Sequence, residues 1–170
     1  MKINTRNISL WVVVILLQIL VLNELNVSGY INPYLYPLLI ILLPFDIAGW
    51  LLLAIAAALG IFIDLFTGTL GMHLFALVLM AGIKPSIVRT LSLGKYNQGA
   101  YINIKQHGIL VTMSFVSVLF LVHHFSYFFL ETFASSGAAY AFLRSLASAF
   151  FSILLSFILL LFVNVWRNER

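Results

Sequence analysis

Residues 60–73, with the sequence GIFIDLFTGTLGMH, connect two long apolar runs through a short turn. The first run covers residues 47–66 and the second covers residues 70–84. Gly68 and Gly71 lie in the turn, and glycine adopts backbone angles that other residues avoid. This stretch therefore predicts two helices joined by a tight turn.

The composition indicates that lipid surrounds most of the chain. Of the 170 residues, 63% are apolar and 8% are charged, whereas soluble domains have about 45–50% apolar and about 25% charged residues. So few charges do not cover a water-facing surface, which excludes a soluble enzyme, a nucleic-acid-binding module and a disordered regulator. The absence of cysteine excludes disulfides, thiolate metal sites and cysteine nucleophiles.

Six apolar runs are candidate membrane spans, over residues 8–23, 31–45, 47–66, 70–84, 109–130 and 140–165. The second is the weakest, because a helix over residues 31–43 rises only about 20 Å against a hydrocarbon core of about 30 Å. We expect Asp46 to cap the third span and Lys84-Pro85 to end the fourth. Backbone groups in lipid need internal partners, so we predict an all-α integral membrane protein, a six-transmembrane-helix bundle forming one domain over residues 1–170.

The basic residues predict the orientation of these spans. With six spans, one side of the membrane carries eight of them: Lys2, Arg6, Lys84, Arg89, Lys95, Lys105, Arg167 and Arg170. The other side carries Glu24 and Glu131, with Arg144 as the exception. By the positive-inside rule, both termini are expected in the cytoplasm. If the second run did not cross, the basic loop after residue 84 would lie outside, so six spans are favoured over five.

Asp64 is the most informative residue of the apolar runs, because a charge in a membrane span is costly unless it is paired or hydrated. Ala56, Gly60, Asp64 and Gly68 recur every four residues and share one helical stripe. Three interpretations stay open. Asp64 lies hydrated in the outer interface or caps the turn; it faces the bundle and organises the outer helix ends; or it belongs to a proton or ion relay.

Arg144, near the outer start of the sixth span, is the candidate partner of Asp64. Its side chain either snorkels to the lipid headgroups or forms an ion pair with Asp64 or Glu131. We hypothesise that Asp64 and Arg144 interact.

The histidines do not form a recognisable metal motif, and we expect no metal or other cofactor. His123 and Glu131 lie eight residues apart, about 12 Å along a helix, and His123 and His124 point in different directions. Their aromatic neighbours predict an outer aromatic belt with these histidines at headgroup depth. The sixth span carries Ser145, Ser148, Ser152 and Ser156 on one face, which is typical of a face packed on other helices. We find no nucleophile-and-base pair and no nucleotide-binding motif, so no enzymatic activity is expected.

The stretch from Gly60 to His73 resembles the core signature of the rod shape-determining protein MreD family. The shared pattern is a glycine, an aspartate four residues later, and a glycine-flanked turn into the next helix. Supporting similarities are the chain length, the residues Leu16-Leu17-Gln18-Ile19 in the first span, and Asn32-Pro33 at the start of the second. The resemblance covers about residues 33–83 and implies a partner-binding or structural role for a set of signature residues: Gly60, Asp64, Gly68, Gly71 and His73, with Pro37 and Pro44 shaping the second span.

The resemblance implies a non-catalytic scaffold and regulator of bacterial cell shape in the inner membrane. Such a protein binds the single-span protein MreC and supports lateral peptidoglycan synthesis in the elongation complex, whose other members are MreB, RodZ, RodA and penicillin-binding protein 2. Self-association into a homo-oligomer is left open, and no nucleic acid is expected as a partner.

An alternative function comes from a second likeness, because the MreD family resembles the substrate-binding subunits of energy-coupling-factor transporters, which are also small six-helix proteins. This alternative is a vitamin-binding membrane subunit. It predicts a ligand-sized cavity with convergent polar groups near the outer face, for which Tyr34, Tyr36, Asp64, His73 and Arg144 are the candidates.

Overall fold

The computed structural model describes residues 5–25, 30–93, 100–132 and 137–168, with side chains over 9–25, 30–93, 100–132 and 137–162. Its elements are the helices α1 (Thr5–Leu17), α2 (Pro37–Ile41), α3 (Gly49–Thr67), α4 (Met72–Thr90), α5 (Ile104–His107), α6 (Ile109–Thr132) and α7 (Ala138–Asn168), with a π-helical segment η1 (Gln18–Leu22) continuing α1. Of the basic residues used for orientation, Lys2, Lys95 and Arg170 lie outside the described residues, as do the side chains of Arg6 and Arg167.

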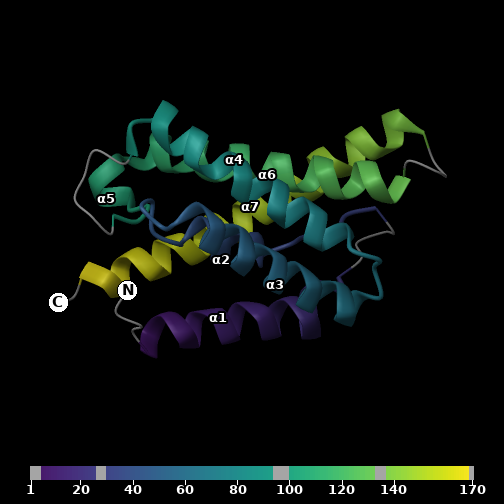
Figure 1. The fold of residues 1–170 in the computed structure, drawn as a ribbon, viewed down its shortest axis with the longest axis horizontal. Helices are drawn as coiled ribbons and strands as arrows, with labels where there is room; N and C mark the ends of the chain where they lie inside the picture. The colour runs from purple at the N-terminus through teal and green to yellow at the C-terminus, as the bar shows by residue number, and fades with distance from the viewer. Residues whose placement is uncertain (1–4, 26–29, 94–99, 133–136, 169–170) are drawn as a thin grey trace.

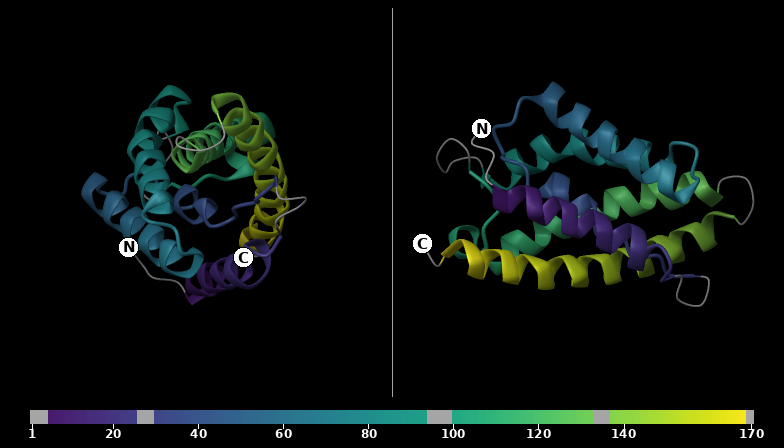
Figure 2. Two further views of the ribbon diagram at one scale, coloured as in Figure 1. Left: turned by 90° about the vertical axis from the view of Figure 1, so that its right-hand side faces the viewer. Right: turned by 90° about the horizontal axis from the view of Figure 1, so that it is seen from below.

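The long helices lie side by side along one axis (Figure 1). The start of α1, the end of α7 and α5 lie at one end of the bundle, which we call the N/C end. The turn between α3 and α4 lies at the opposite end, which we call the hairpin end, together with η1 and the end of α6. Viewed from the hairpin end, the helices α1, α3, α4, α6 and α7 surround α2 (Figure 2, left).

Four helices in the described part of the chain are long and apolar enough to cross a membrane. They are α3, α4, α6 and the Ala138–Phe162 part of α7, and a shorter apolar helix covers Ser9–Leu22. Large apolar side chains point outward from these helices, such as Trp50, Leu110 and Phe150, which are 73%, 77% and 63% exposed. This confirms an all-helical fold with helices that are candidates for membrane spans. The expected six spanning helices are not all present as helices.

The second predicted span, residues 31–45, is not a spanning helix. It is an extended segment followed by the five-residue helix α2, and every residue from Tyr34 to Leu43 is buried. Pro33 and Pro37 lack a backbone N–H, and Pro44 follows α2, so a continuous helix is disfavoured here. The segment runs from the hairpin end toward the N/C end through the interior of the bundle. It passes inside protein, where non-helical backbone is tolerated at membrane depth.

The side chain of Gln18 bonds to the backbone of this extended segment. Its Oε1 accepts from Leu35 N at 2.6 Å, and its Nε2 donates to Pro33 O at 3.3 Å and to Asn23 Oδ1 at 2.8 Å. Gln18 is fully buried and is the first residue of η1. A buried polar side chain of this kind needs such partners, and here it supplies the bonds that the segment lacks within itself.

Two serines of α7 also accept hydrogen bonds from the backbone of the extended segment. Ser148 Oγ accepts from Asn32 N at 3.0 Å, and Ser152 Oγ accepts from Tyr34 N at 2.8 Å while donating to Ser148 O at 2.8 Å. Ser145, Ser148, Ser152 and Ser156 are all buried. The predicted packing of this serine face is therefore confirmed, with extended backbone as its main partner.

Lys84 bonds the other end of the buried segment. Its Nζ donates at 2.9 Å to Ile40 O, in the last turn of α2, and at 2.8 Å to Leu43 O, two residues after α2 ends. Carbonyls at the C-terminus of a helix need partners of this kind. The residue is 1% exposed. Its assignment to a cytoplasmic basic loop was therefore wrong: Lys84 lies inside the bundle.

Two predicted helix boundaries are also wrong. The residue at the N-cap of α3 is Ala48, without a side-chain capping bond, and Asp46 lies outside the helix. Helix α4 continues through Pro85 to Thr90 instead of stopping at Lys84-Pro85. A proline removes one backbone hydrogen bond from a helix interior, and the packing of α4 against α3 and α6 maintains the helix beyond it.

Candidate functional site

Gly60 allows the close approach of α3 to α4. A Cβ atom at this position would overlap Leu74 Cα and lie 2.8 Å from Leu74 N. Ala56 and Gly60 are both buried, so this part of the predicted small-residue stripe faces α4. Small residues at such a position let two helix backbones approach closely in a membrane.

The turn between α3 and α4 depends on two glycines in left-handed backbone conformations. Gly68 has a φ of 68° and forms the C-cap of α3, where its N–H donates to Asp64 O, and Gly71 has a φ of 83° and precedes α4. Other residues pay a steric cost for such angles. The predicted tight turn is therefore confirmed.

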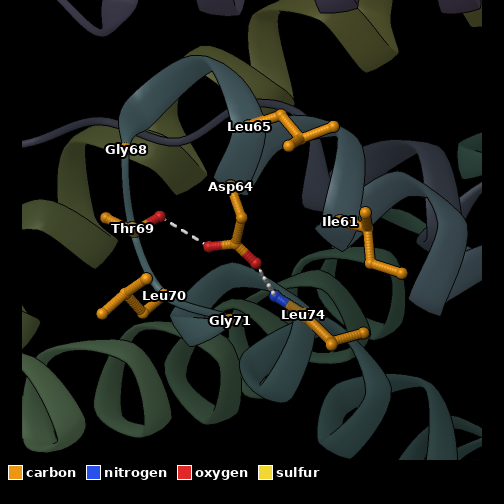
Figure 3. A pocket seen from close by; sticks show the side chains of 8 residues that line it. All are labelled: Ile61, Asp64, Leu65, Gly68, Thr69, Leu70, Gly71 and Leu74. Atoms are coloured by element: carbon orange, nitrogen blue, oxygen red, sulfur yellow. Dashed lines mark hydrogen bonds between the residues drawn. The ribbon is translucent and has the colours of Figure 1, made fainter.

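The Asp64 carboxylate caps the start of α4. Oδ1 accepts from Thr69 Oγ1 at 2.5 Å, and Oδ2 accepts from Leu74 N at 2.9 Å (Figure 3). Oδ1 also accepts from His73 N at 3.1 Å. A carboxylate is favourable here, because the first N–H groups of a helix lack internal partners and carry partial positive charge. Of the open interpretations of Asp64, the structure shows the capping of the turn.

Arg144 forms its ion pair with Glu131, not with Asp64. Arg144 Nη1 lies 2.7 Å from Glu131 Oε2, and the guanidinium lies 4.7 Å from the ring centroid of Phe128. The pair connects the end of α6 to the start of α7. The hypothesis of an Asp64–Arg144 pair is thus replaced by the alternative partner, Glu131, because Asp64 is engaged with the turn.

Tyr36 connects two histidines in the interior of the bundle. Its hydroxyl lies 2.6 Å from His73 Nδ1 and 2.7 Å from His123 Nε2. A phenol has one proton, so it donates to one ring and accepts from the other. The sequence offered no signal for this cluster, because its members come from three segments that are far apart in the chain.

His123 and His124 do not belong to an outer aromatic belt, as the sequence had suggested. Both are fully buried. His124 Nδ1 lies 2.9 Å from Phe120 O, and its Nε2 lies 3.0 Å from Ser152 Oγ. Of the aromatic residues that suggested an outer belt, Tyr127 and Phe128 are buried inside the bundle, whereas Phe129 is 53% exposed. Among the described residues, no three side chains gather as a metal site.

A polar pocket of about 360 Å³ opens at the hairpin end. It is lined by η1 and the residues after it, the extended segment, the α3–α4 turn and α6: Ile19, Leu22, Asn23, Glu24, Asn32, Tyr34, Phe66, Thr67, Thr69, His73, Tyr127 and Glu131. We call it the outer pocket. It contains Tyr34 and His73 from the predicted cavity, whereas Tyr36, Asp64 and Arg144 are not in its lining.

A second hollow, of about 350 Å³, lies on the α3–α4 hairpin itself (Figure 3). Its lining is mostly apolar: Ile61, Asp64, Leu65, Gly68, Thr69, Leu70, Gly71 and Leu74. We call it the hairpin groove. Leu70 is 98% exposed and Leu65 is 76% exposed, so residues 60–73 present an apolar surface. The same stretch stabilises the turn through Asp64 and the two glycines. Pro37 begins α2 in the interior, and neither it nor Pro44 lines this groove.

No protein-family model, curated protein or solved structure matches this chain. Its class therefore follows from the structure. The described residues form an all-helical protein with four helices suited to crossing a membrane, a braced hairpin, and a buried non-helical segment in the middle.

Proposed function

We propose that this chain is a non-catalytic membrane scaffold of the MreD type, which binds MreC in the bacterial inner membrane and supports lateral peptidoglycan synthesis in the elongation complex. The observation that carries the proposal is the hairpin of residues 60–73. The residues that resemble the family signature form one structural unit there, in which Asp64 and the two glycines fix the turn and Gly60 fixes the helix contact.

The proposed topology has six passages with the N/C end in the cytoplasm. Five passages are α1 with η1, α3, α4, α6 and α7, and the second is the buried segment that contains α2. The excess of basic residues expected at the cytoplasmic side supports this orientation. Burial of Lys84 removes one charge from that count, and Arg89 and Lys105 still lie at the N/C end.

The proposed contact surface for MreC is the hairpin groove. Lipid offers no hydrophobic drive between helices, so a partner's membrane span associates through close packing and a matching shape. Exposed Leu65 and Leu70 line the groove together with two small residues, Gly68 and Gly71. MreB, RodZ, RodA and penicillin-binding protein 2 would then join through the larger complex.

The Leu70→Asp variant tests this surface. We expect at least a tenfold loss of co-purified MreC, because a carboxylate in an apolar contact costs more than the 1.4 kcal/mol that a tenfold change requires. The thermal unfolding midpoint of the variant alone should not change, since the Leu70 side chain is 98% exposed. The readout is the ratio of MreC to this protein after affinity purification in mild detergent.

Leu110→Asp is the matched control, because Leu110 is also highly exposed, at 77%, but lies at the start of α6 at the N/C end. It should retain MreC. Equal retention of MreC by both variants would remove the hairpin groove from the proposal, and an equal loss would show a general effect of the added charge.

The outer pocket favours the alternative function, a vitamin-binding subunit of an energy-coupling-factor transporter. Its volume lies at the small end of the range for ligand sites. A panel of vitamins in a thermal-shift measurement separates the two functions. A specific ligand at 100 times its dissociation constant should stabilise the protein by about 2.7 kcal/mol, whereas a scaffold that only binds MreC shows no shift with any vitamin.

A further inference from the structure

We propose that the outer pocket is a binding site for a small ligand that carries an ammonium group. The proposal does not depend on the scaffold function, because it rests on a pocket whose lining shares only Thr69 with the hairpin groove. Of the twelve residues that line the pocket, five belong to the residue types that make up 63% of the chain: Ile19, Leu22, Phe66, Tyr34 and Tyr127. The two tyrosines among them carry hydroxyl groups. The lining is thus more polar than the chain as a whole, and polar groups that converge on a cavity are typical of ligand sites.

The charges in the pocket wall favour a cation. Glu24 and Glu131 are its acidic residues, and no lysine or arginine lines it. Glu131 uses Oε2 to bond Arg144, but 29% of its side-chain surface stays accessible. Two phenol rings, Tyr34 and Tyr127, also line the pocket, and aromatic faces attract ammonium groups.

His73 supplies a fixed polar atom whose bonding capacity is not used. The residue is 1% exposed, its ring stacks on Tyr127 at a centroid distance of 4.4 Å, and Tyr34 meets it edge-on at 5.1 Å. Tyr36 bonds Nδ1, while the buried Nε2 at the other edge of the ring has no hydrogen-bond partner. Buried polar atoms without a partner are rare in native structures, and this one belongs to a residue of the pocket wall.

Two proton arrangements fit the bonds of the Tyr36 hydroxyl, and the proposal uses the one in which His73 Nε2 is an acceptor. If His73 Nδ1–H donates to the phenol oxygen, the phenol O–H donates to His123 Nε2, and His73 Nε2 keeps its lone pair. His73 Nε2 is buried, so an ammonium N–H donates to it after a displacement of the pocket wall, which also carries Glu24 and Glu131. A carboxylate ligand would be repelled by Glu24, since the charge of Glu131 is balanced by Arg144.

A matched series of probes tests the charge of the ligand. The full chain in neutral phosphatidylcholine nanodiscs is titrated with aminopentanol, pentanediol and hydroxypentanoate, which have the same chain length and differ in charge. We expect the dissociation constant of aminopentanol to be at least tenfold lower than that of pentanediol, and hydroxypentanoate to bind most weakly. Charge-assisted hydrogen bonds of this kind justify a tenfold preference.

Two further measurements place the site. Glu24→Gln combined with Glu131→Gln should abolish the preference for aminopentanol, whereas Asp46→Asn, which removes an exposed carboxylate at the N/C end, should keep it. In the unaltered protein labelled with ¹⁵N-histidine, aminopentanol should shift the Nε2 resonance of His73 and leave that of His107 unchanged.

Three outcomes would overturn the proposal: equal binding of the three probes, tighter binding of the anion, or an unshifted His73 resonance under saturating aminopentanol. Because the probe series and the resonance use the unaltered chain, the proposal stays testable even if the double variant fails to fold. Loss of MreC binding in Leu70→Asp has no bearing on these results, so the two proposals fail separately.

Discussion

Gly60→Ala is expected to destabilise the protein by about 1–3 kcal/mol or more, the usual cost of added volume in a well-packed interior. The new methyl group meets the backbone of Leu74, which has no rotamer with which to avoid it. Either α3 and α4 separate, or the start of α4 shifts away from the Asp64 carboxylate. The measurement is the thermal unfolding midpoint of the purified protein in one detergent, with its yield from membranes as a second readout.

Gly82→Ala is the control, because a methyl group at Gly82 in α4 meets no atom within 4 Å. Alanine is favoured over glycine in helices by up to about 1 kcal/mol, so this variant should be neutral or slightly more stable. Equal stability of the two variants would contradict the close contact at Gly60. The same geometry means that Gly60→Arg, a natural choice for blocking a docking surface, would disrupt the hairpin and is unsuitable as a test of MreC binding.

Lys84→Met is expected to destabilise the protein by about 1–3 kcal/mol, because the buried carbonyl of Leu43, just after α2, loses the ammonium donor. The second acceptor of Lys84, Ile40 O in α2, keeps its bond from Leu43 N at 3.3 Å. Methionine keeps most of the volume of lysine, so the lost bonds dominate over packing. Relief from burying the ammonium group offsets part of the loss. Thermal unfolding and the accessibility of α2 to hydrogen exchange report the effect.

Lys105→Met is the matched control, since it removes the same charge from an exposed residue at the N/C end. It should leave both measurements unchanged. If Lys84→Met matched this control in stability and exchange, the bonds from Nζ to the end of α2 would have no structural importance.

The α3–α4 hairpin was predictable from sequence because its determinants are local. Two apolar runs, an aspartate and two glycines within residues 60–73 are enough to indicate a turn between antiparallel helices. The serine face of α7 was also predictable, since residues spaced by three or four positions share one side of a helix. The backbone groups that these serines bond were not predictable from the sequence.

The second passage and the interior polar groups could not be predicted, because their partners are distant in the chain. An apolar run between prolines fits either a short helix or an extended buried segment, and only Gln18, Ser148 and Ser152 decide in favour of the extended form. In the sequence, Lys84 has the pattern of a basic residue in a loop. Its acceptors, in and just after α2, are apparent only in the folded chain. His73 and His123 are 50 positions apart, and Tyr36 brings them together only in the folded chain.

The partners of the extended segment also restrict the order of assembly. Residues 31–36 leave the ribosome early, yet two of the hydroxyls that accept their N–H groups belong to α7, which is synthesised last. Exposed to hydrocarbon alone, these amides would be unsatisfied at a cost of several kcal/mol each. Until α7 has been synthesised and packs beside them, these amides therefore need another hydrogen-bonding partner, which water or the translocon would supply.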